Sequence, residues 1–371
     1  MRPLAALLLA LLAVGAAPAA TLAPRLDALV ELAHRDRHFD GVVLIGRDDD
    51  IAYSRAIGEE APGVPMRTDS VWRLASLTKQ VTALLVMQQV AAGTIDLDSP
   101  VSRYWPTWPS PHAGQITIRM LLKHMSGLAD PEDSPKDAQG VPGFYRARGA
   151  LASPMRNAAG YCALKPRTPP GIEYHYNNCD YLVLGALLQI ITGQSYADLV
   201  QQRIAGPLGL DHFGLFSPAR PDSPATMPGY DTEGRPGPRL NLGVYGAAGS
   251  LFGTPQDIWR FDRALMAGTL LDAAATAEMW KGDPAIGMTA LGAWSYTVAL
   301  AGCPDPVALV ERRGAIGGIQ IRNFFEPSAR IAVILLTNRA AVDFGEIWQG
   351  KGLSYDFLST ALCPAPTAPN P

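Results

Sequence analysis

The sequence predicts an α/β (α+β) fold, in which an antiparallel sheet flanked by helices is formed from both chain ends and a second lobe is mostly helical. Short β-rich runs occur near both ends of the chain, and apolar residues at helical spacing fill its middle. The simplest closure pairs the strands of the two ends in one sheet. We expect one unit over residues 21–363. Its α/β lobe would cover about residues 25–75 and 290–362, and its helical lobe about residues 76–289.

The start of the chain has the order of a secretory signal peptide, which we expect to cover residues 1–20. Arg2 precedes an apolar run over residues 4–14, and small residues surround Ala19, near which we expect cleavage. That run is shorter than a membrane-spanning helix requires. The segment therefore predicts a periplasmic or secreted protein with no stable membrane span after cleavage. The alternative is an uncleaved N-terminal anchor.

Hydrophobic periodicity predicts the elements up to residue 191. Apolar positions three and four residues apart indicate helices, and alternating or β-branched runs bounded by turn residues indicate strands. The predicted helices cover residues 26–38, 77–90 and 180–191, and the predicted strands cover residues 42–45 and 51–54. The helix at 180–191 is too short to span a bilayer, so we expect it to be buried against its lobe.

Proline and glycine interrupt the middle of the chain, and strands return after it. The stretches 131–170 and 218–238 are rich in both residues and are predicted to form long surface loops or cavity walls. Further strands are predicted at residues 293–300, 307–312, 319–325 and 331–336, before a helix at residues 353–362. The Pro-rich tail, residues 364–371, is expected to be disordered.

Four cysteines allow two disulfides in an oxidising compartment: Cys162, Cys179, Cys303 and Cys363. Three pairings can be drawn, and sequence alone does not choose between them. We favour Cys162 with Cys179, which leaves the other two to pair, because each bridge then stays within one region. Buried free thiols are the alternative. The sequence has no CxxC motif and no Cys–His cluster, so none of the four has the spacing of a metal ligand.

Composition argues against several classes of protein. With 48% hydrophobic and 18% charged residues, the chain can bury one large core or two lobes that share an interface. The net charge of −3, with no dense Lys/Arg stripe, argues against nucleic acid as a partner. A metallohydrolase would need a motif such as HExxH, and the pair His34 and His38 is more typical of a solvated helix face. We expect no metal and no organic cofactor.

Ser76 and Lys79 form the first pair that indicates chemistry. Residues three apart on a helix share a face, so the Lys79 amine can reach the Ser76 hydroxyl. A serine hydroxyl becomes a good nucleophile when a neighbour accepts its proton, and the N-terminus of a helix favours developing negative charge. Ser-x-x-Lys alone is a weak signal, because a chain of this length contains it about once by chance.

Tyr176 and Asn178 supply context for that pair. They lie two positions apart after a turn that begins at Pro170, and they could provide a base and an amide. A phenol has a reference pKa of about 10, so Tyr176 acts as a base near neutrality only if cations such as Lys79 lower that pKa. Without the serine and the lysine, Tyr176 would be read as a core or loop aromatic.

The third segment, residues 311–318, is a strand that enters a Gly-rich turn, with the cation of Arg312 just ahead of it. Gly314 permits close approach of the backbone, and the amide of Ala315 could donate to an oxyanion. Taken singly, the segment is as well explained by an ordinary hairpin with exposed arginines.

In this order and at these separations, the three segments resemble the serine β-lactamase and penicillin-binding-protein family, which includes DD-peptidases, D-aminopeptidases and β-lactamase-related esterases. The order is most similar to that of the class C β-lactamases. The resemblance extends over roughly residues 40–345, where independent local signals agree. Further landmarks of the family are residues 72–75, 95–101, 121–128 and 248–257.

The resemblance implies a β-lactamase/transpeptidase-like fold and an exported serine hydrolase. Its substrate would be a D-amino-acid peptide, a β-lactam-like compound or a carboxyl ester, with peptidoglycan-derived peptides among the candidates. Ser76 would attack the acyl carbon while Lys79 and Tyr176 move its proton, and water would release the acyl-enzyme. His124 and Ser126 would form a structural turn.

The resemblance also implies the substrate-binding residues: Asn178, Arg312, Gly314 and Ala315. Asn178 would contact the acyl side chain or Lys79, and the amides of Ser76 and Ala315 would form the oxyanion hole. The sequence departs from the family at Arg312, where relatives carry Lys or His. Arginine keeps a fixed charge and a fork that suits a carboxylate, but it cannot carry a proton. Asn177 replaces a residue that is often small and would narrow the pocket.

Two other classes remain as alternatives. An α/β-hydrolase would need Gly-x-Ser-x-Gly on a strand-to-helix turn, which the sequence lacks. The second alternative is a catalytically silent, penicillin-binding-protein-like module that binds peptidoglycan fragments or a partner protein. A binding module has no need to keep Ser76 and Lys79 in register, so we favour the enzyme.

Overall fold

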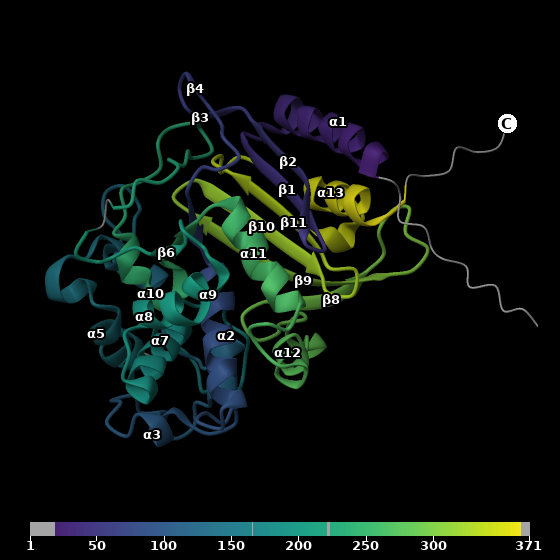
Figure 1. The fold of residues 1–371 in the computed structure, drawn as a ribbon. Coiled ribbons are helices and arrows are strands. Elements are labelled where there is room, and N and C mark those ends of the chain that lie inside the picture. The colour runs from purple at the N-terminus through teal and green to yellow at the C-terminus, as the bar shows by residue number, and fades with distance from the viewer. Residues whose placement is uncertain (1–18, 165, 221–222, 365–371) are drawn as a thin grey trace, which may run out of the picture.

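Both ends of the chain join one antiparallel sheet in the computed structural model, which describes residues 19–164, 166–220 and 223–364 (Figure 1). Within these residues the sheet has six strands in the order β2-β1-β11-β10-β9-β8. They are β1 (Gly41–Arg47), β2 (Asp50–Ile57), β8 (Trp294–Val298), β9 (Val307–Ile316), β10 (Ile319–Glu326) and β11 (Ile331–Thr337). Because β1 pairs with β11, the predicted closure of the fold through the two chain ends is confirmed.

The central strands of this sheet are buried on both faces. Along β1, Val42 and Leu44 join one core cluster, whereas Val43 and Ile45 join another, as the two-residue period of a strand requires. Helix α11 covers the first face, and α1 and α13 cover the second (Figure 1). These helices are α1 (Ala19–Arg37), α11 (Pro255–Met266) and α13 (Leu353–Leu362).

The second lobe is mostly helical and packs against the first face of the sheet. Its two longest helices are α2 (Thr78–Ala91) and α7 (Cys179–Thr192). The others are α3 (Val101–Tyr104), α4 (Ile118–Leu122), α5 (Pro154–Ala159), α6 (Tyr161–Leu164), α8 (Tyr196–Val200), α9 (Gly206–Leu208), α10 (Gly246–Gly249) and α12 (Ala273–Met279). Short helical turns η1 (Pro131–Asp133), η2 (Gly143–Arg146), η3 (Gly149–Ala152), η4 (Gln201–Ala205), η5 (Leu242–Tyr245), η6 (Pro284–Ile286) and η7 (Ile347–Gln349) complete the helical elements of the described chain.

Short strands were not predicted, because two to four residues carry too little periodicity. In the described chain, a small sheet at the junction of the lobes has the order β5-β7-β6, and β3 pairs with β4 in a separate hairpin. The strands are β3 (Glu59–Ala61), β4 (Val64–Pro65), β5 (Trp72–Ala75), β6 (Gly214–Leu215) and β7 (Leu251–Gly253).

The longer predicted elements lie close to the observed ones, with three differences. Helix α1 begins at Ala19, seven residues before the predicted 26–38. Strand β9 continues to Ile316, so the predicted end at residue 312 was too early. The stretch 131–170 was predicted as loop or cavity wall and contains several of the short helices. The predicted signal peptide and Pro-rich tail lie outside the described residues, except at their inner ends.

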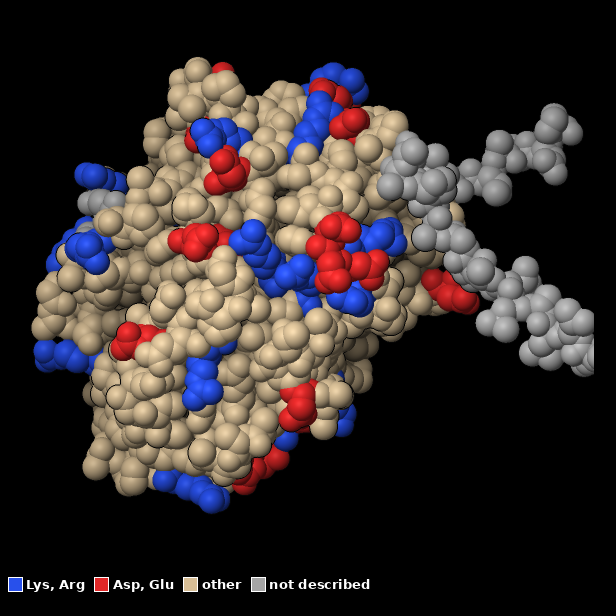
Figure 2. All heavy atoms as spheres, viewed as in Figure 1, with Lys and Arg blue, Asp and Glu red and all other residues tan. Residues whose placement is uncertain are grey.

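The surface carries both signs of charge. On the face drawn in Figure 2, basic and acidic side chains are interspersed over a largely uncharged surface, with no continuous basic stripe. Among the described residues, no single helix is both long and apolar enough to cross a membrane, and α7 with the segment Tyr196–Leu208 meets that test only as a pair bent by 83°.

The four cysteines form the favoured pairs, Cys162 with Cys179 and Cys303 with Cys363. The first bridge ties α6 to the start of α7. The second closes a loop of 60 residues between the turn after β8 and the end of α13. It therefore links the end of α13 to the segment that follows β8, an edge strand of the large sheet.

Replacement of Cys303 and Cys363 by alanine should lower the free energy of unfolding by about 2–4 kcal/mol, because the unfolded chain regains the entropy of an open 60-residue loop. Denaturant unfolding of the oxidised wild type and of the double variant would measure the loss. The reduced wild type, in which both bridges open, should lose at least as much. A double variant as stable as the oxidised wild type would contradict the assigned role of this bridge.

Candidate active site

Ser76 lies in the sharp turn between β5 and α2, two residues before the helix begins. Ala75 takes a left-handed backbone conformation, with φ 47°, although it has a side chain. The hydroxyl of Thr78 donates to the Ala75 carbonyl at 2.6 Å and accepts from the Leu251 amide at 3.1 Å. Strand β7 therefore holds this turn in place, and Ser76 faces the cavity between the two lobes.

Lys79 is fully buried directly behind the serine. Its Nζ donates to Ser76 Oγ at 3.3 Å, to Asn178 Oδ1 at 2.7 Å and to the Ala248 carbonyl at 2.8 Å. All three N–H groups of an ammonium thus have acceptors. Burial, together with the Arg312 guanidinium, lowers the pKa of Lys79 against the opposing effect of Tyr176.

Tyr176 approaches the serine from the other side. Its hydroxyl donates to Ser76 Oγ at 2.8 Å and accepts from a terminal nitrogen of Arg312 at 2.7 Å. Burial alone would raise the pKa of Tyr176, but the positive charges of Arg312 and Lys79 outweigh it and lower the pKa to about 8. A phenol with this pKa is partly ionised near neutrality, as the sequence analysis required of a base.

Arg312 lies inside the protein and not on the cavity wall. It is 2% exposed, its Nε donates to the Ser76 carbonyl at 2.8 Å, and its guanidinium packs 5.1 Å from the ring of Trp294. From its residue type, this fork suits a substrate carboxylate. In the structure, Nε and one terminal nitrogen are already engaged, so Arg312 supports the serine and the tyrosine.

Gly314 allows β9 to pass close to the turn that carries the serine. A Cβ atom at this position would lie 2.8 Å from the Leu74 carbonyl oxygen. This distance is shorter than a van der Waals contact, so a residue with a side chain would force the backbone of β5 or β9 to shift. Ala315, the next residue, lines the cavity together with Ser76. Both Gly314 and Ala315 lie within β9, and the Gly-rich turn follows at residues 317–318.

A buried polar cluster supports Tyr176 from behind. The His124 ring lies 4.4 Å from the Tyr176 ring, and its Nδ1 is 3.0 Å from Asp180 Oδ2. Burial lowers the pKa of His124 well below its usual value, so the ring is neutral. The amide of Asn177 donates to Asp180 Oδ2 at 2.9 Å and is fully buried, so Asn177 belongs to this cluster and does not narrow the pocket as predicted. His124 and Ser126 both contact Asp180, in keeping with a structural turn.

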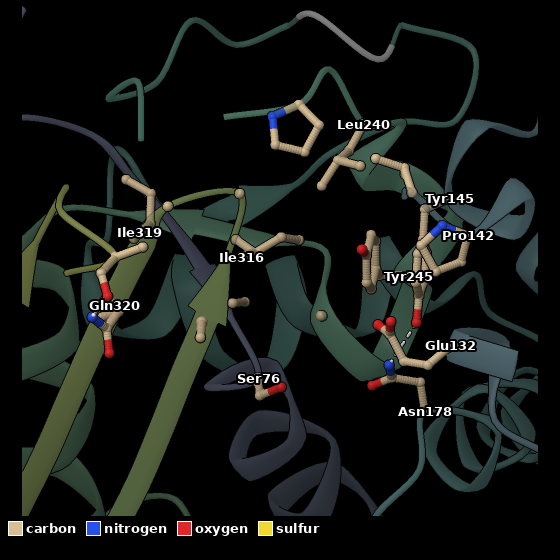
Figure 3. A pocket seen from close by; sticks show the side chains of 18 of the residues that line it. Ser76, Glu132, Pro142, Tyr145, Asn178, Leu240, Tyr245, Ile316, Ile319 and Gln320 are labelled. Atoms are coloured by element: carbon tan, nitrogen blue, oxygen red, sulfur yellow. Dashed lines mark hydrogen bonds between the residues drawn. The ribbon is translucent and has the colours of Figure 1, made fainter. Parts of the chain in front are cut away.

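The cavity beside Ser76 measures about 610 Å³. Figure 3 shows Tyr145, Glu132 and Asn178 on one side of it and Ile316, Ile319 and Gln320 on the other. Sequence reasoning missed most of these wall residues. Residues 139–145 fall within the Pro/Gly-rich stretch for which a cavity wall was one expectation, whereas no pattern singled out Tyr245, which stacks on Tyr145 with ring centroids 4.2 Å apart. No group of three His, Cys, Asp or Glu in the described residues could hold a metal ion.

A serine hydroxyl between a buried lysine and a tyrosine of lowered pKa, at the junction of an antiparallel sheet and a helical lobe, defines a serine hydrolase of the Ser-Lys-Tyr class. The comparisons with known proteins agree. The profile of the Beta-lactamase family matches residues 25–351, and the chain belongs to this family. Members of the family include esterases, penicillin-binding proteins and DD-peptidases.

Three similar proteins illustrate its range. Esterase EstB of Burkholderia gladioli is 32% identical over 370 residues, with 87% of this chain and 92% of the esterase aligned. The D-alanyl-D-alanine-carboxypeptidase/endopeptidase AmpH of Escherichia coli (strain K12) is 25% identical, with 81% of this chain and 80% of AmpH aligned. The crystal structure of D-amino acid amidase from Ochrobactrum anthropi SV3 shares the fold, with a TM-score of 0.73, 24% identity and coverage of 92% of this chain and 98% of the amidase.

The geometry predicts that Tyr176 ionises at a lower pH than an ordinary tyrosine, because its pKa is lowered to about 8. A pH titration of the protein, followed by the near-ultraviolet difference spectrum of tyrosinate, should show a single early transition near pH 8. The transition should be absent in Tyr176→Phe and should move to higher pH in Arg312→Gln, which removes one of the two lowering charges. Tyr174→Phe, a neighbour whose pKa burial raises, is the matched control and should keep the transition. An early transition that survives Tyr176→Phe would contradict the assignment.

Proposed function

We propose that the protein is an exported serine hydrolase that cleaves an amide or ester through an acyl-enzyme on Ser76. One observation carries the proposal: Ser76 Oγ lies within hydrogen-bond distance of both Lys79 Nζ, at 3.3 Å, and the Tyr176 hydroxyl, at 2.8 Å. Either group can accept the serine proton once it is deprotonated. Burial lowers the pKa of Lys79, and the nearby cations lower the pKa of Tyr176.

The reaction begins when Ser76 Oγ bonds to the acyl carbon and its proton passes to Tyr176 or Lys79. The same pair then protonates the leaving amine or alkoxide as the bond from the acyl carbon to that group breaks. Water adds to the ester on Ser76, releases the carboxylic acid and restores the hydroxyl. We assign the backbone amides of Ser76 and Ala315 as hydrogen-bond donors to the oxyanion that forms during acylation and again during deacylation, since both residues border the cavity.

Asn178 links the catalytic groups to the substrate side of the cavity. Its Oδ1 accepts from Lys79 at 2.7 Å and its amide donates to the Tyr145 hydroxyl at 3.0 Å. The side chain thus orients the lysine while it borders the space that an acyl group would fill. We assign it to positioning Lys79 and contacting the acyl side chain.

The reaction class is supported by the named relatives. EstB is an esterase and AmpH a carboxypeptidase and endopeptidase, so the family scaffold handles both esters and amides. Export is supported by the two disulfides of the described chain, which persist in oxidising compartments, and by the signal-like composition of residues 1–20.

Incubation of the protein with an activated acyl ester should produce a covalent adduct on Ser76, visible as a gain in intact mass equal to the acyl group. Ser76→Ala should fold normally and show no adduct, because it removes only the attacking oxygen. Ser102→Ala, a serine on α3 away from the cavity, is the matched control and should acylate as the wild type does. An adduct of wild-type yield in Ser76→Ala would overturn the assignment. No adduct with any ester or amide would favour the silent binding module.

The acylation rate should rise as the pH increases through about 8, because the active form is the one in which Tyr176 has lost its proton. Tyr176→Phe should slow acylation by about 10²–10⁴-fold and abolish this rise of the rate with pH, the alkaline limb of the profile. Stopped-flow release of a chromogenic leaving group from pH 6 to 10, values chosen to bracket about 8, would measure it. Tyr174→Phe should preserve the limb, and a wild-type rate in Tyr176→Phe would exclude this tyrosine as the base.

A further inference from the structure

The cavity beside Ser76 carries charge of one sign. Among the described residues that line it, Asp130 and Glu132 are the only charged side chains, and none is basic. Both belong to the segment around η1, which faces the cavity from the helical lobe. Figure 3 shows the Glu132 side chain next to Tyr145 and Asn178, on the same side of the cavity.

Neither carboxylate is paired directly with a cation of the described residues, although the charges of Lys79 and Arg167 on Asp130 and of Lys136 on Glu132 partly oppose the effect of burial on the two pKa values. Within the described residues, no Lys or Arg lies within ion-pair distance of either one, whereas the neighbouring Asp133 pairs with Arg167. Asp130 is 7% exposed, and its Oδ1 accepts from the Glu132 amide at 3.1 Å. Burial raises the pKa of both carboxyl groups. Glu132 is exposed, so the cost of desolvation falls mainly on the buried Asp130, and a ligand that brings a cation relieves that cost.

The surroundings of the two carboxylates also suit a cation. Tyr145 and Tyr245 are stacked beside them with nearly parallel rings, 1° apart. Burial, together with the charges of Glu132 and Asp130, raises the pKa of Tyr145, so its hydroxyl keeps its proton and interacts with Glu132. Aromatic rings next to carboxylates are a common receptor for ammonium groups.

Among the described residues that line the cavity, no Lys or Arg is present to meet a substrate carboxylate. The guanidinium of Arg312, whose residue type suits that role, donates to the Ser76 carbonyl and to Tyr176 and is outside the cavity lining. The ammonium of Lys79 is fully buried and donates its hydrogen bonds to Ser76, Asn178 and Ala248. The charges that face the substrate are therefore the two acidic ones.

We propose that the acyl part of the substrate carries a cationic amino group, which Glu132 and Asp130 bind while Ser76 attacks the acyl carbon. The substrate class is thus an amide or ester of an amino acid, or of a peptide with a free amino end, and not an acyl donor whose recognition depends on a carboxylate. This assignment rests on the proposed acyl-enzyme chemistry and specifies its substrate.

The test compares two para-nitrophenyl esters of nearly equal shape, those of alanine, in both enantiomers, and of isobutyric acid. They differ in an ammonium group against a methyl group, and Ser76→Ala supplies the background rate. The ammonium also makes its ester intrinsically more reactive. The decisive quantity is therefore the ratio of the two kcat/KM values, alanyl over isobutyryl, and its change on substitution.

Glu132→Gln and Asp130→Asn should each lower that ratio at least about tenfold for the better enantiomer, since each removes a charge-assisted contact with the ammonium. Asp133→Asn is the matched control, a carboxylate in the same turn that is not in the cavity lining, and should keep the wild-type ratio. A ratio that is unchanged in both Glu132→Gln and Asp130→Asn would overturn the inference while leaving Ser76 acylation intact. Failure of Ser76 to react with either ester would instead overturn the proposed function.

Discussion

The site depends on the burial of two cations on either side of one phenol. Lys79 from α2 and Arg312 from β9 both have their charged groups inside the protein, and Tyr176 lies between them. Removing two like charges from water is unfavourable unless hydrogen bonds and an opposite charge compensate. The carbonyls of Ser76 and Ala248 supply the hydrogen bonds, and the phenol supplies the opposite charge when it loses its proton, for which its pKa is lowered to about 8. The serine is thus held where its proton has a ready acceptor.

The rest of the fold can be understood as the means of holding these groups in register. The Arg312 side chain reaches Tyr176 only because β9 passes directly over the turn after β5, and Gly314 makes that approach possible. Strand β9 belongs to the sheet that joins both ends of the chain. Tyr176 belongs to the turn before α7, which the buried cluster of His124 and Asp180 fixes. Each lobe therefore contributes part of the charge balance, and neither lobe alone contains it.

The sequence predicted the long elements and the three separated segments well, because periodicity and residue type determine both. Residues 76, 176 and 312 are far apart in the chain, yet the structure brings their side chains into contact. What the sequence could not provide was the direction in which a side chain points. Asn177 turns inward to Asp180, because a buried carboxylate there needs a donor, and this need becomes visible only when α7 is placed. The wall formed by Tyr145 and Tyr245 joins residues a hundred positions apart whose contact no local pattern encodes.

Arginine at position 312 connects the chemistry of the site with its selectivity. A lysine or histidine in this place could exchange a proton with Tyr176, whereas an arginine side chain does not serve as a proton carrier. In the proposed mechanism, the serine proton is therefore transferred by Tyr176 and Lys79. The same guanidinium donates to the Ser76 carbonyl and to the Tyr176 hydroxyl, so its positive charge interacts with groups inside the protein. The cavity then keeps the negative charge of Asp130 and Glu132 without a basic counterpart in the described lining, which is the charge that the proposed cationic substrate would meet.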